Sequence, residues 1–253
     1  SSMLFKLTDE QLMIQSMVRE FAREVVAAKA MTRDKTKEFP ADNLKKMAEL
    51  GLLGMMVPFE YEGSDSDTVG YVLALSEIAY SCASTAVVMS VHNSIVCESI
   101  LNFGTEDQKQ HYLKDLAMGK YIGAFALTEP EAGSDPVSQQ TTAVKDGDHY
   151  IINGTKSNFV SNGGIADVYL VFACVDPSQG LRGSGAFVIP GWSNAIGLEK
   201  MVNDSTVAVL MALLATWLLA QPAGQMASTS GLLGNLILFS IIMLFLVAGW
   251  WRR

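Results

Sequence analysis

Apolar residues recur at every third or fourth position through most of the first 120 residues, which is the spacing of amphipathic helices. The run Thr8-Asp-Glu-Gln11 has the form of a capping box, so we expect a helix to begin there. Two later segments are uniformly hydrophobic, as the buried helices of a bundle are. The pattern predicts helices over about 9–30, 40–50, 68–80, 84–102 and 106–118.

After Gly119 the pattern changes from that of helices to that of strands. Short runs rich in β-branched and aromatic residues alternate with turn formers such as Asp146-Gly147-Asp148 and Asn153-Gly154. The expected strands are 121–127, 140–145, 150–152, 158–161, 168–175 and 186–189. Many short strands separated by tight turns are typical of an all-β module. We therefore predict an α+β chain, with an N-terminal α-helical bundle over 1–122 and an antiparallel β-barrel or sandwich domain over 123–200.

A third pattern occupies residues 201–253, where we expect a hydrophobic helical tail. Thr206–Ala220 is an apolar run, and Leu232–Trp251 is a second run without a charge. Twenty residues of helix span about 30 Å, the thickness of a bilayer core, and Trp followed by Arg is typical of a cytoplasmic helix end. These features predict a transmembrane hairpin over 206–251. A helix buried in a soluble domain stays open as the alternative for each run.

Composition narrows the choice of compartment and partner. The chain has 18 Lys and Arg against 26 Asp and Glu, a net charge of −8, which is a poor electrostatic match for nucleic acid. The three cysteines are widely spaced and form no CxxC pair, which fits free thiols in a reducing compartment. The three histidines have no partners at zinc-ligand spacing, so we predict no metal site. We expect a cytoplasmic body without nucleic-acid partners.

The ten residues Ala126-Leu-Thr-Glu-Pro-Glu-Ala-Gly-Ser-Asp135 resemble the flavin-site signature of the acyl-CoA dehydrogenases. The resemblance covers about residues 4–200 and is closest to short-chain, butyryl-type members. Its other matching runs are Val91-His-Asn-Ser94, Phe103–Lys109, Asp148–Lys156 and Phe159–Gly164. It implies FAD as cofactor, an acyl-CoA thioester as substrate and α,β-dehydrogenation to the 2-enoyl-CoA. It also implies an electron-transferring flavoprotein as partner and a homo-oligomer as one expected state.

The resemblance assigns roles to residues of the signature. The family's equivalents of Phe125, Leu127 and Thr128 line the flavin, and the Thr128 hydroxyl would donate to the polar edge of the ring. Such donors are needed because the reduced ring becomes anionic. Gly133 and Ser134 would let backbone and hydroxyl approach the flavin phosphates and the acyl-CoA, which makes Ser134 a substrate-binding candidate as well.

Phe159-Val160-Ser161 resembles the family's second flavin element. In that element an aromatic residue covers one flavin face and a hydroxyl residue bonds near N5, roles that Phe159 and Ser161 would fill. One departure stands out: the family has one residue between the lysine and the aromatic residue, whereas Ser157 and Asn158 are both interposed here. An inserted residue reverses the facing of a strand unless a bulge absorbs it.

We assign no catalytic residue. In the family the general base is a carboxylate in a C-terminal helical domain, and the resemblance makes Glu129 part of the scaffold rather than the base. Glu131, in the same signature, is set aside as base too. His92 lies in an apolar helical segment, where a hydrogen-bonded core histidine is favoured over a base.

The resemblance ends near Lys200, before the family's base-bearing domain. We therefore expect a dehydrogenase that is truncated and inactive alone. Two explanations stay open: a truncated or frame-shifted chain whose tail comes from adjacent coding sequence, or a membrane anchor on a dehydrogenase fragment. The alternative function is a non-catalytic, membrane-tethered module that binds flavin, acyl-CoA or a partner protein.

Overall fold

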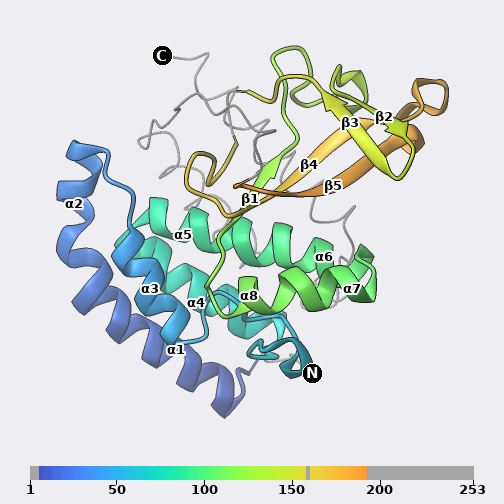
Figure 1. The fold of residues 1–253 in the computed structure, drawn as a ribbon. Helices are drawn as coiled ribbons and strands as arrows, with labels where there is room; N and C mark the ends of the chain where they lie inside the picture. Colours follow the sequence, from blue (N-terminus) through green and yellow to red (C-terminus); the bar gives the residue numbers. More distant parts are fainter. Residues whose placement is uncertain (1–5, 158–159, 193–253) are drawn as a thin grey trace, which may run out of the picture. The chain divides into compact units, whose positions relative to one another are not determined.

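The computed structural model describes residues 6–157 and 160–192. These residues form two compact units, with the chain dividing between Lys120 and Tyr121, and each unit is described by itself. The first unit is helical and the second is built on a sheet (Figure 1).

The first unit consists of helices joined by short turns. Several of them run on through π-helical turns without a break in the chain direction. They are α1 (Asp9–Phe21), η1 (Ala22–Val26), α2 (Ala27–Thr36), α3 (Ala41–Glu49), η2 (Phe59–Tyr61), α4 (Thr68–Ser81), α5 (Ala83–Ser90), η3 (Val91–Cys97), α6 (Glu98–Phe103), α7 (Glu106–Gln108), η4 (Lys109–Leu113) and α8 (Lys114–Ala117). Their positions agree closely with the helices that the apolar spacing predicts.

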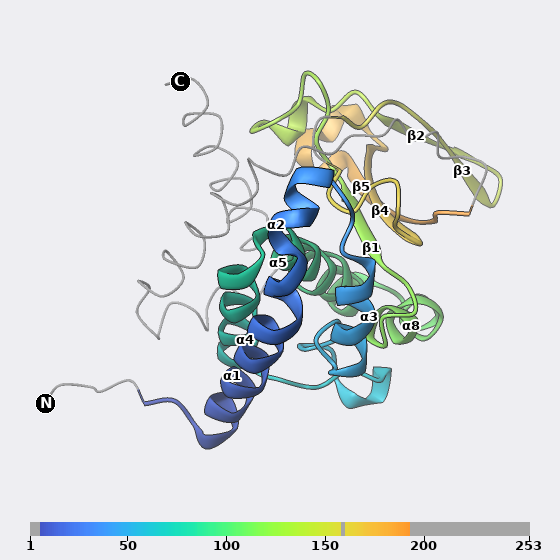
Figure 2. The ribbon, with the colours of Figure 1, turned by 90° about the vertical axis from the view of Figure 1, so that its left-hand side faces the viewer.

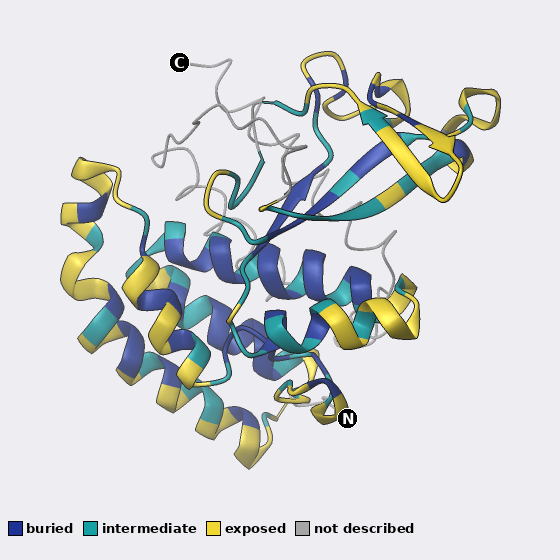
Figure 3. Cartoon of the chain, in the orientation of Figure 1, coloured by how far each residue is buried: buried dark blue, intermediate teal, exposed yellow. Residues whose placement is uncertain are grey.

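Local chemistry fixes where the first helix starts. The Thr8 hydroxyl accepts from the Gln11 backbone N–H at 3.1 Å, and the Gln11 side chain accepts from the Thr8 N–H at 3.0 Å, so the predicted capping box is present. Helix α1 packs along α4, and α4 along α5 (Figures 1 and 2). Figure 3 shows that α4 and α5 are mostly buried, whereas α1 and α2 are largely exposed on one side.

The second unit is a five-stranded mixed sheet. Its strands are β1 (Gly123–Ala126), β2 (Thr142–Asp146), β3 (His149–Asn153), β4 (Val168–Cys174) and β5 (Ser184–Pro190), with short 3₁₀ turns at Pro136–Ser138 and Pro177–Gly183. The strand order is β1-β4-β2-β3, and β5 pairs with β4. Strand β4 is parallel to β1 and to β2 but antiparallel to β5.

The prediction of an antiparallel barrel or sandwich is therefore wrong in topology. Among the described residues the sheet is mixed and does not close into a barrel. The tight turn at Gly147 does give the expected antiparallel hairpin, β2–β3. The parallel pairing joins residues far apart in sequence, such as Gly123 and Val168, and strand periodicity carries no information about such pairings.

The predicted membrane hairpin, 206–251, lies outside the described residues, so the hydrophobic tail stays a prediction. In the described part, the helical stretch Ala83–Phe103 is long and apolar enough to cross a membrane by length and composition. Most of its apolar window is buried inside the protein, as the core helix of a soluble protein would be, so the stretch is weak evidence for a membrane span.

His92 lies at the centre of the helical unit. Its side chain is fully buried, and its Nε2 lies 2.9 Å from the Leu116 carbonyl oxygen. This agrees with the interpretation of His92 as a hydrogen-bonded core histidine. Burial penalises the charged imidazolium and lowers the pKa of His92 to about 4.

This histidine should make the helical unit sensitive to acid. Because its pKa in the folded protein lies below the ordinary value of about 6.5, the unfolded chain binds more protons between about pH 6.5 and 4, and stability falls as pH drops through that window. The loss attributable to His92 is at most about 3 kcal/mol. We predict that His92→Gln flattens this part of the pH profile of urea unfolding, followed by far-UV circular dichroism. His111→Gln, which removes an exposed histidine, is the control, and an unchanged profile for His92→Gln would contradict the prediction.

Candidate functional site

The signature begins in strand β1 and continues beyond it. All four residues of β1 are buried, and the Phe125 ring packs edge-on against Phe172 of β4, with ring centroids 5.3 Å apart. Leu127 and Thr128, which follow the strand, are half-buried. The Thr128 side chain has no hydrogen-bond partner among the described residues, so its hydroxyl is free to bond a ligand.

The described part of the second candidate element, Val160 and Ser161, lies beside the first. Ser161 pairs with Phe125 in an isolated antiparallel bridge, and the Ser157 N–H donates to the Thr128 carbonyl oxygen at 3.0 Å. Asn162, with a positive φ of 65°, fixes the following turn, because its side-chain amide donates to the Gly123 carbonyl oxygen at 2.9 Å. The structure thus brings the candidate residues Phe125, Thr128 and Ser161 together. Phe159 lies outside the described residues.

The extra residue of the second element shows in the register of these contacts. Phe125 is opposite Ser161, whereas Thr128 bonds Ser157. One segment therefore advances three residues while the other advances four. The difference of one residue is compatible with the insertion, and part of the longer segment lies outside the described residues. Ser161 nonetheless pairs with Phe125.

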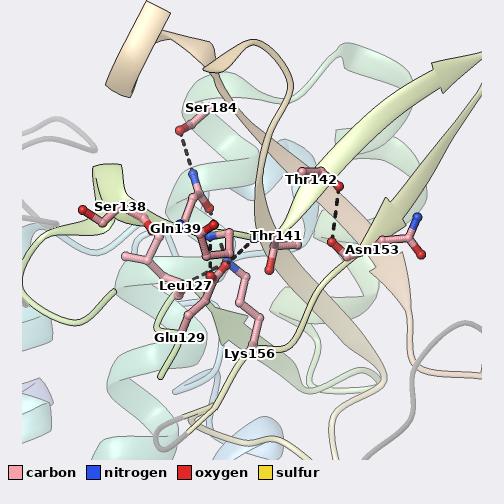
Figure 4. A network of polar contacts seen from close by, with 10 residues as sticks. Leu127, Glu129, Ser138, Gln139, Thr141, Thr142, Asn153, Lys156 and Ser184 are labelled. Carbon is pink, nitrogen blue, oxygen red and sulfur yellow. Dashed lines mark hydrogen bonds and ion pairs between the residues drawn. The ribbon is translucent and has the colours of Figure 1, made fainter. Parts of the chain in front are cut away.

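A buried ion pair holds the two elements in place (Figure 4). The Lys156 ammonium lies 2.7 Å from Oε1 of Glu129, and both side chains are at most 9% exposed. Lys156 Nζ also donates to the Leu127 carbonyl oxygen at 3.0 Å and to Oε1 of Gln139 at 3.3 Å. Lys156 belongs to the segment before the second element, whereas its partners all belong to residues 127–141 between β1 and β2, called the signature loop below. The pair therefore fastens these segments to each other.

Glu129 uses its remaining acceptor positions on the backbone of the same loop. Its two oxygens accept from the N–H groups of Gln140 at 2.5 Å and Thr141 at 3.0 Å. Gly154 makes the close approach possible, since a Cβ at this position would come within 2.6 Å of the Thr141 backbone. Gln139 extends the network to strand β5 by donating to the Ser184 hydroxyl at 2.7 Å.

Burial and hydrogen bonding compete in setting the charge of the pair. Burial alone would raise the pKa of Glu129, but hydrogen bonds from Lys156, Thr141 and Gln140 outweigh it, and the pKa is lowered. Burial lowers the pKa of Lys156, and the bond to Glu129 opposes that shift. Glu129 is therefore ionised at neutral pH and fully engaged. Its contribution to stability is present above about pH 4.3 and is lost as pH falls through its lowered pKa.

The glycine-serine part of the signature is exposed. A Cβ on Gly133 would meet no atom within 4 Å, so packing within the described residues does not require glycine there. The Ser134 side chain is exposed and forms no hydrogen bond in the described part of the chain. Asp135 caps the next turn through the Val137 N–H and the Ser138 hydroxyl. Clearance at Gly133 and a free Ser134 hydroxyl are compatible with a ligand that approaches from outside.

The donor chemistry fits a flavin. Thr128, Ser134 and Ser161 each offer a hydroxyl without a hydrogen-bond partner in the described residues, and two of them lie on adjoining segments beside β1. A flavin ring needs donors of this kind at its polar edge. No three His, Cys, Asp or Glu side chains in the described part of the chain gather as metal ligands would, and the absence of a metal stays a prediction.

Sequence reasoning missed the residues that hold the site. Lys156 and Gln139 were not assigned roles, because nothing in their local pattern links them to Glu129, which is 27 residues from Lys156. The signal that could have found Lys156 is a lone cation two residues after the Asn153-Gly154 turn.

The chain belongs to the acyl-CoA dehydrogenase family. The model of the family's N-terminal domain matches residues 8–120, and that of its middle domain matches residues 124–216. The second match therefore extends beyond residue 200, into the segment assigned above to the tail.

Similar proteins support the same family. The chain is 47% identical over 198 residues to the short-chain specific acyl-CoA dehydrogenase of Clostridium acetobutylicum, covering 78% of this chain and 52% of that protein. A solved structure described as the electron transferring flavoprotein of Acidaminococcus fermentans matches at 42% identity with a TM-score of 0.76, covering 78% of this chain and 52% of that one. A glutaryl-CoA dehydrogenase from Mycobacterium smegmatis in complex with FADH2 matches at 30% identity with a TM-score of 0.74, covering 80% and 50%. The chain thus spans about half the length of the proteins it matches.

The ion pair should be essential for the stability of the sheet unit. We predict that Glu129→Gln lowers the free energy of unfolding by about 3–5 kcal/mol, because it leaves the buried Lys156 ammonium without a counter-charge. Urea unfolding followed by tryptophan and tyrosine fluorescence measures the change. Glu131→Gln, at an exposed position of the same loop, is the matched control and should change stability by less than about 0.5 kcal/mol.

Replacing both residues of the ion pair tests whether the lost stability comes from the unpaired charge or from altered packing. The double variant Glu129→Leu/Lys156→Met should recover part of the loss, since no unpaired charge remains. A cost of Glu129→Gln below about 1 kcal/mol, typical of a surface ion pair, would refute the buried role.

Proposed function

We propose that this chain supplies the N-terminal helices and the flavin-binding sheet of an FAD-dependent acyl-CoA dehydrogenase that converts an acyl-CoA to the 2-enoyl-CoA. One observation carries the proposal: the two hydroxyl-bearing segments that resemble the family's flavin elements lie side by side. Family membership and the FADH2 complex of a relative support the choice of cofactor.

The residues of this site would bind and orient the flavin. When bound, FAD supplies the acceptor for the hydride that leaves the β-carbon of the thioester. Thr128 and Ser161 would donate hydroxyl hydrogen bonds to the ring edge, and Leu127 would line the ring. Ser134 would bind at the phosphates or the acyl-CoA, where clearance at Gly133 leaves the approach open. Phe159 would cover one flavin face.

Catalysis also requires a base for the α-proton, and neither carboxylate of the signature suits that role. Glu129 is buried, ionised and bonded to Lys156 and to two backbone N–H groups, so it cannot reach a substrate without breaking the network. Glu131 is exposed to solvent. This supports the further proposal that the chain does not turn over substrate alone.

An electron-transferring flavoprotein is the proposed electron acceptor, and the cytoplasm is the proposed compartment. The match to a solved structure described as an electron transferring flavoprotein supports the partner. The second candidate function is a protein that binds flavin or acyl-CoA at the same site without catalysing the reaction. An enoyl-CoA product assay with a dye acceptor separates the two.

We predict that the purified chain binds FAD weakly and that the interaction depends on hydroxyl donors. Thr128→Val and Ser161→Ala should each raise the Kd roughly 3- to 10-fold, the effect of one lost hydrogen bond. Quenching of flavin fluorescence on titration with protein measures the Kd.

Thr142→Val removes an exposed hydroxyl from strand β2 of the same sheet and is the matched control, because it repeats the Thr128 substitution away from the site. Equal Kd values for the control and both site variants, or no binding at high micromolar FAD, would overturn the assignment.

A further inference from the structure

Arg33 is the buried residue of helix α2, and the helix residues around it are largely exposed. It continues the inward-facing stripe of the preceding turns, which is formed by Val18, Ala22 and Val26. Its side chain is 5% exposed. Arginine is almost never buried to this extent unless its charge and its N–H groups are matched.

Only part of the Arg33 guanidinium has hydrogen-bond partners. One nitrogen, Nη2, bonds Oδ1 of Asp42 at the start of α3. Nε and Nη1 are buried and have no hydrogen-bond partner among the described residues. A buried donor without a partner costs free energy, and in native proteins such a group calls for a bound ion, water or ligand.

The counter-charge at Asp42 is also shared. Asp42 accepts from Lys29 Nζ at 2.9 Å and from the Asn43 N–H at 2.9 Å, in addition to the bond from Arg33. The hydrogen bond from Lys29 is the main cause that lowers the pKa of Asp42, so its carboxylate is ionised at neutral pH. Two cations thus divide one negative charge, and the cluster keeps a net charge of +1.

Arg19 is an example of an arginine in this chain whose N–H groups all have a partner or access to water. Its Nε and Nη2 both bond Glu77, at 3.1 and 2.7 Å, in the side-on fork that guanidinium groups form with carboxylates. Arg19 is also 43% exposed, so its remaining N–H groups can reach water. Arg33 has neither a carboxylate bonded side-on to its guanidinium nor the exposure that would let its remaining N–H groups reach water.

We propose that Arg33 is an anion-binding residue whose free N–H groups hold a small oxyanion, the phosphate or carboxylate group of a ligand. The guanidinium suits such a group because it is planar and charged, and because Nη1 carries two N–H donors while Nε presents one more on a different edge. The uncompensated charge of the cluster supplies the attraction. The proposal is independent of the flavin assignment, which rests on the sheet unit.

The test compares the thermal stability of the full chain in sodium phosphate, sodium acetate and sodium chloride at matched ionic strength and pH 7. At an anion concentration about tenfold above its Kd, phosphate should raise the Tm by roughly 2–8 °C over chloride. Arg33→Met should abolish the increment, and Arg19→Met should retain it. An increment in phosphate alone identifies a phosphate site, and increments in both salts identify a general oxyanion site.

Two outcomes would overturn the proposal. An equal increment in wild type and Arg33→Met would show a general salting effect on the protein surface, and no increment in wild type would show that nothing binds. Asp42→Asn provides a change of opposite sign, because it removes the competing negative charge, so the phosphate Kd should fall severalfold.

Should Arg33→Met fail to fold, Arg33→Lys keeps the charge and removes the guanidinium N–H groups. Its increment should drop to less than half that of wild type, and a full increment would refute the role of the guanidinium. Broadening of the phosphate ³¹P resonance by wild type but not by Arg33→Lys gives a readout that does not depend on stability.

Discussion

The ion pair between Lys156 and Glu129 is the interaction on which the candidate site depends. It crosses from the segment that leads into the second flavin element to the loop that carries the signature, and it is almost completely buried. A charge in such a place is costly unless every oxygen and N–H is used, and here Leu127, Gln139, Gln140 and Thr141 supply the remaining bonds. The signature loop has a defined shape because its backbone satisfies a buried carboxylate.

This arrangement explains how a chain with an inserted residue can keep the site. The insertion falls between Lys156 and Phe159, after the ion pair and before the bridge from Ser161 to Phe125. Both ends of this segment are therefore held by contacts of described residues. Asn162 adds a further tie through the Gly123 carbonyl oxygen.

Much of the fold could be predicted from sequence because its signals are local. The Thr8 capping box and the Gly147 hairpin turn involve residues within a few positions of each other. The mixed topology of the sheet could not be predicted, since the pairing of Gly123 with Val168 leaves no trace in periodicity. For the site, the resemblance identified Thr128 and Ser161, but the network that positions them joins residues 11 to 45 positions apart.

The central claim is that the ion pair holds the two flavin elements together, and native-state hydrogen exchange tests it most directly. The Ser157 amide, which bonds the Thr128 carbonyl oxygen, reports whether the elements remain joined. In Lys156→Met, the account predicts that protection of this amide is lost while the amides of the β1–β4 ladder remain protected. Unchanged protection of the Ser157 amide in that variant would contradict the account.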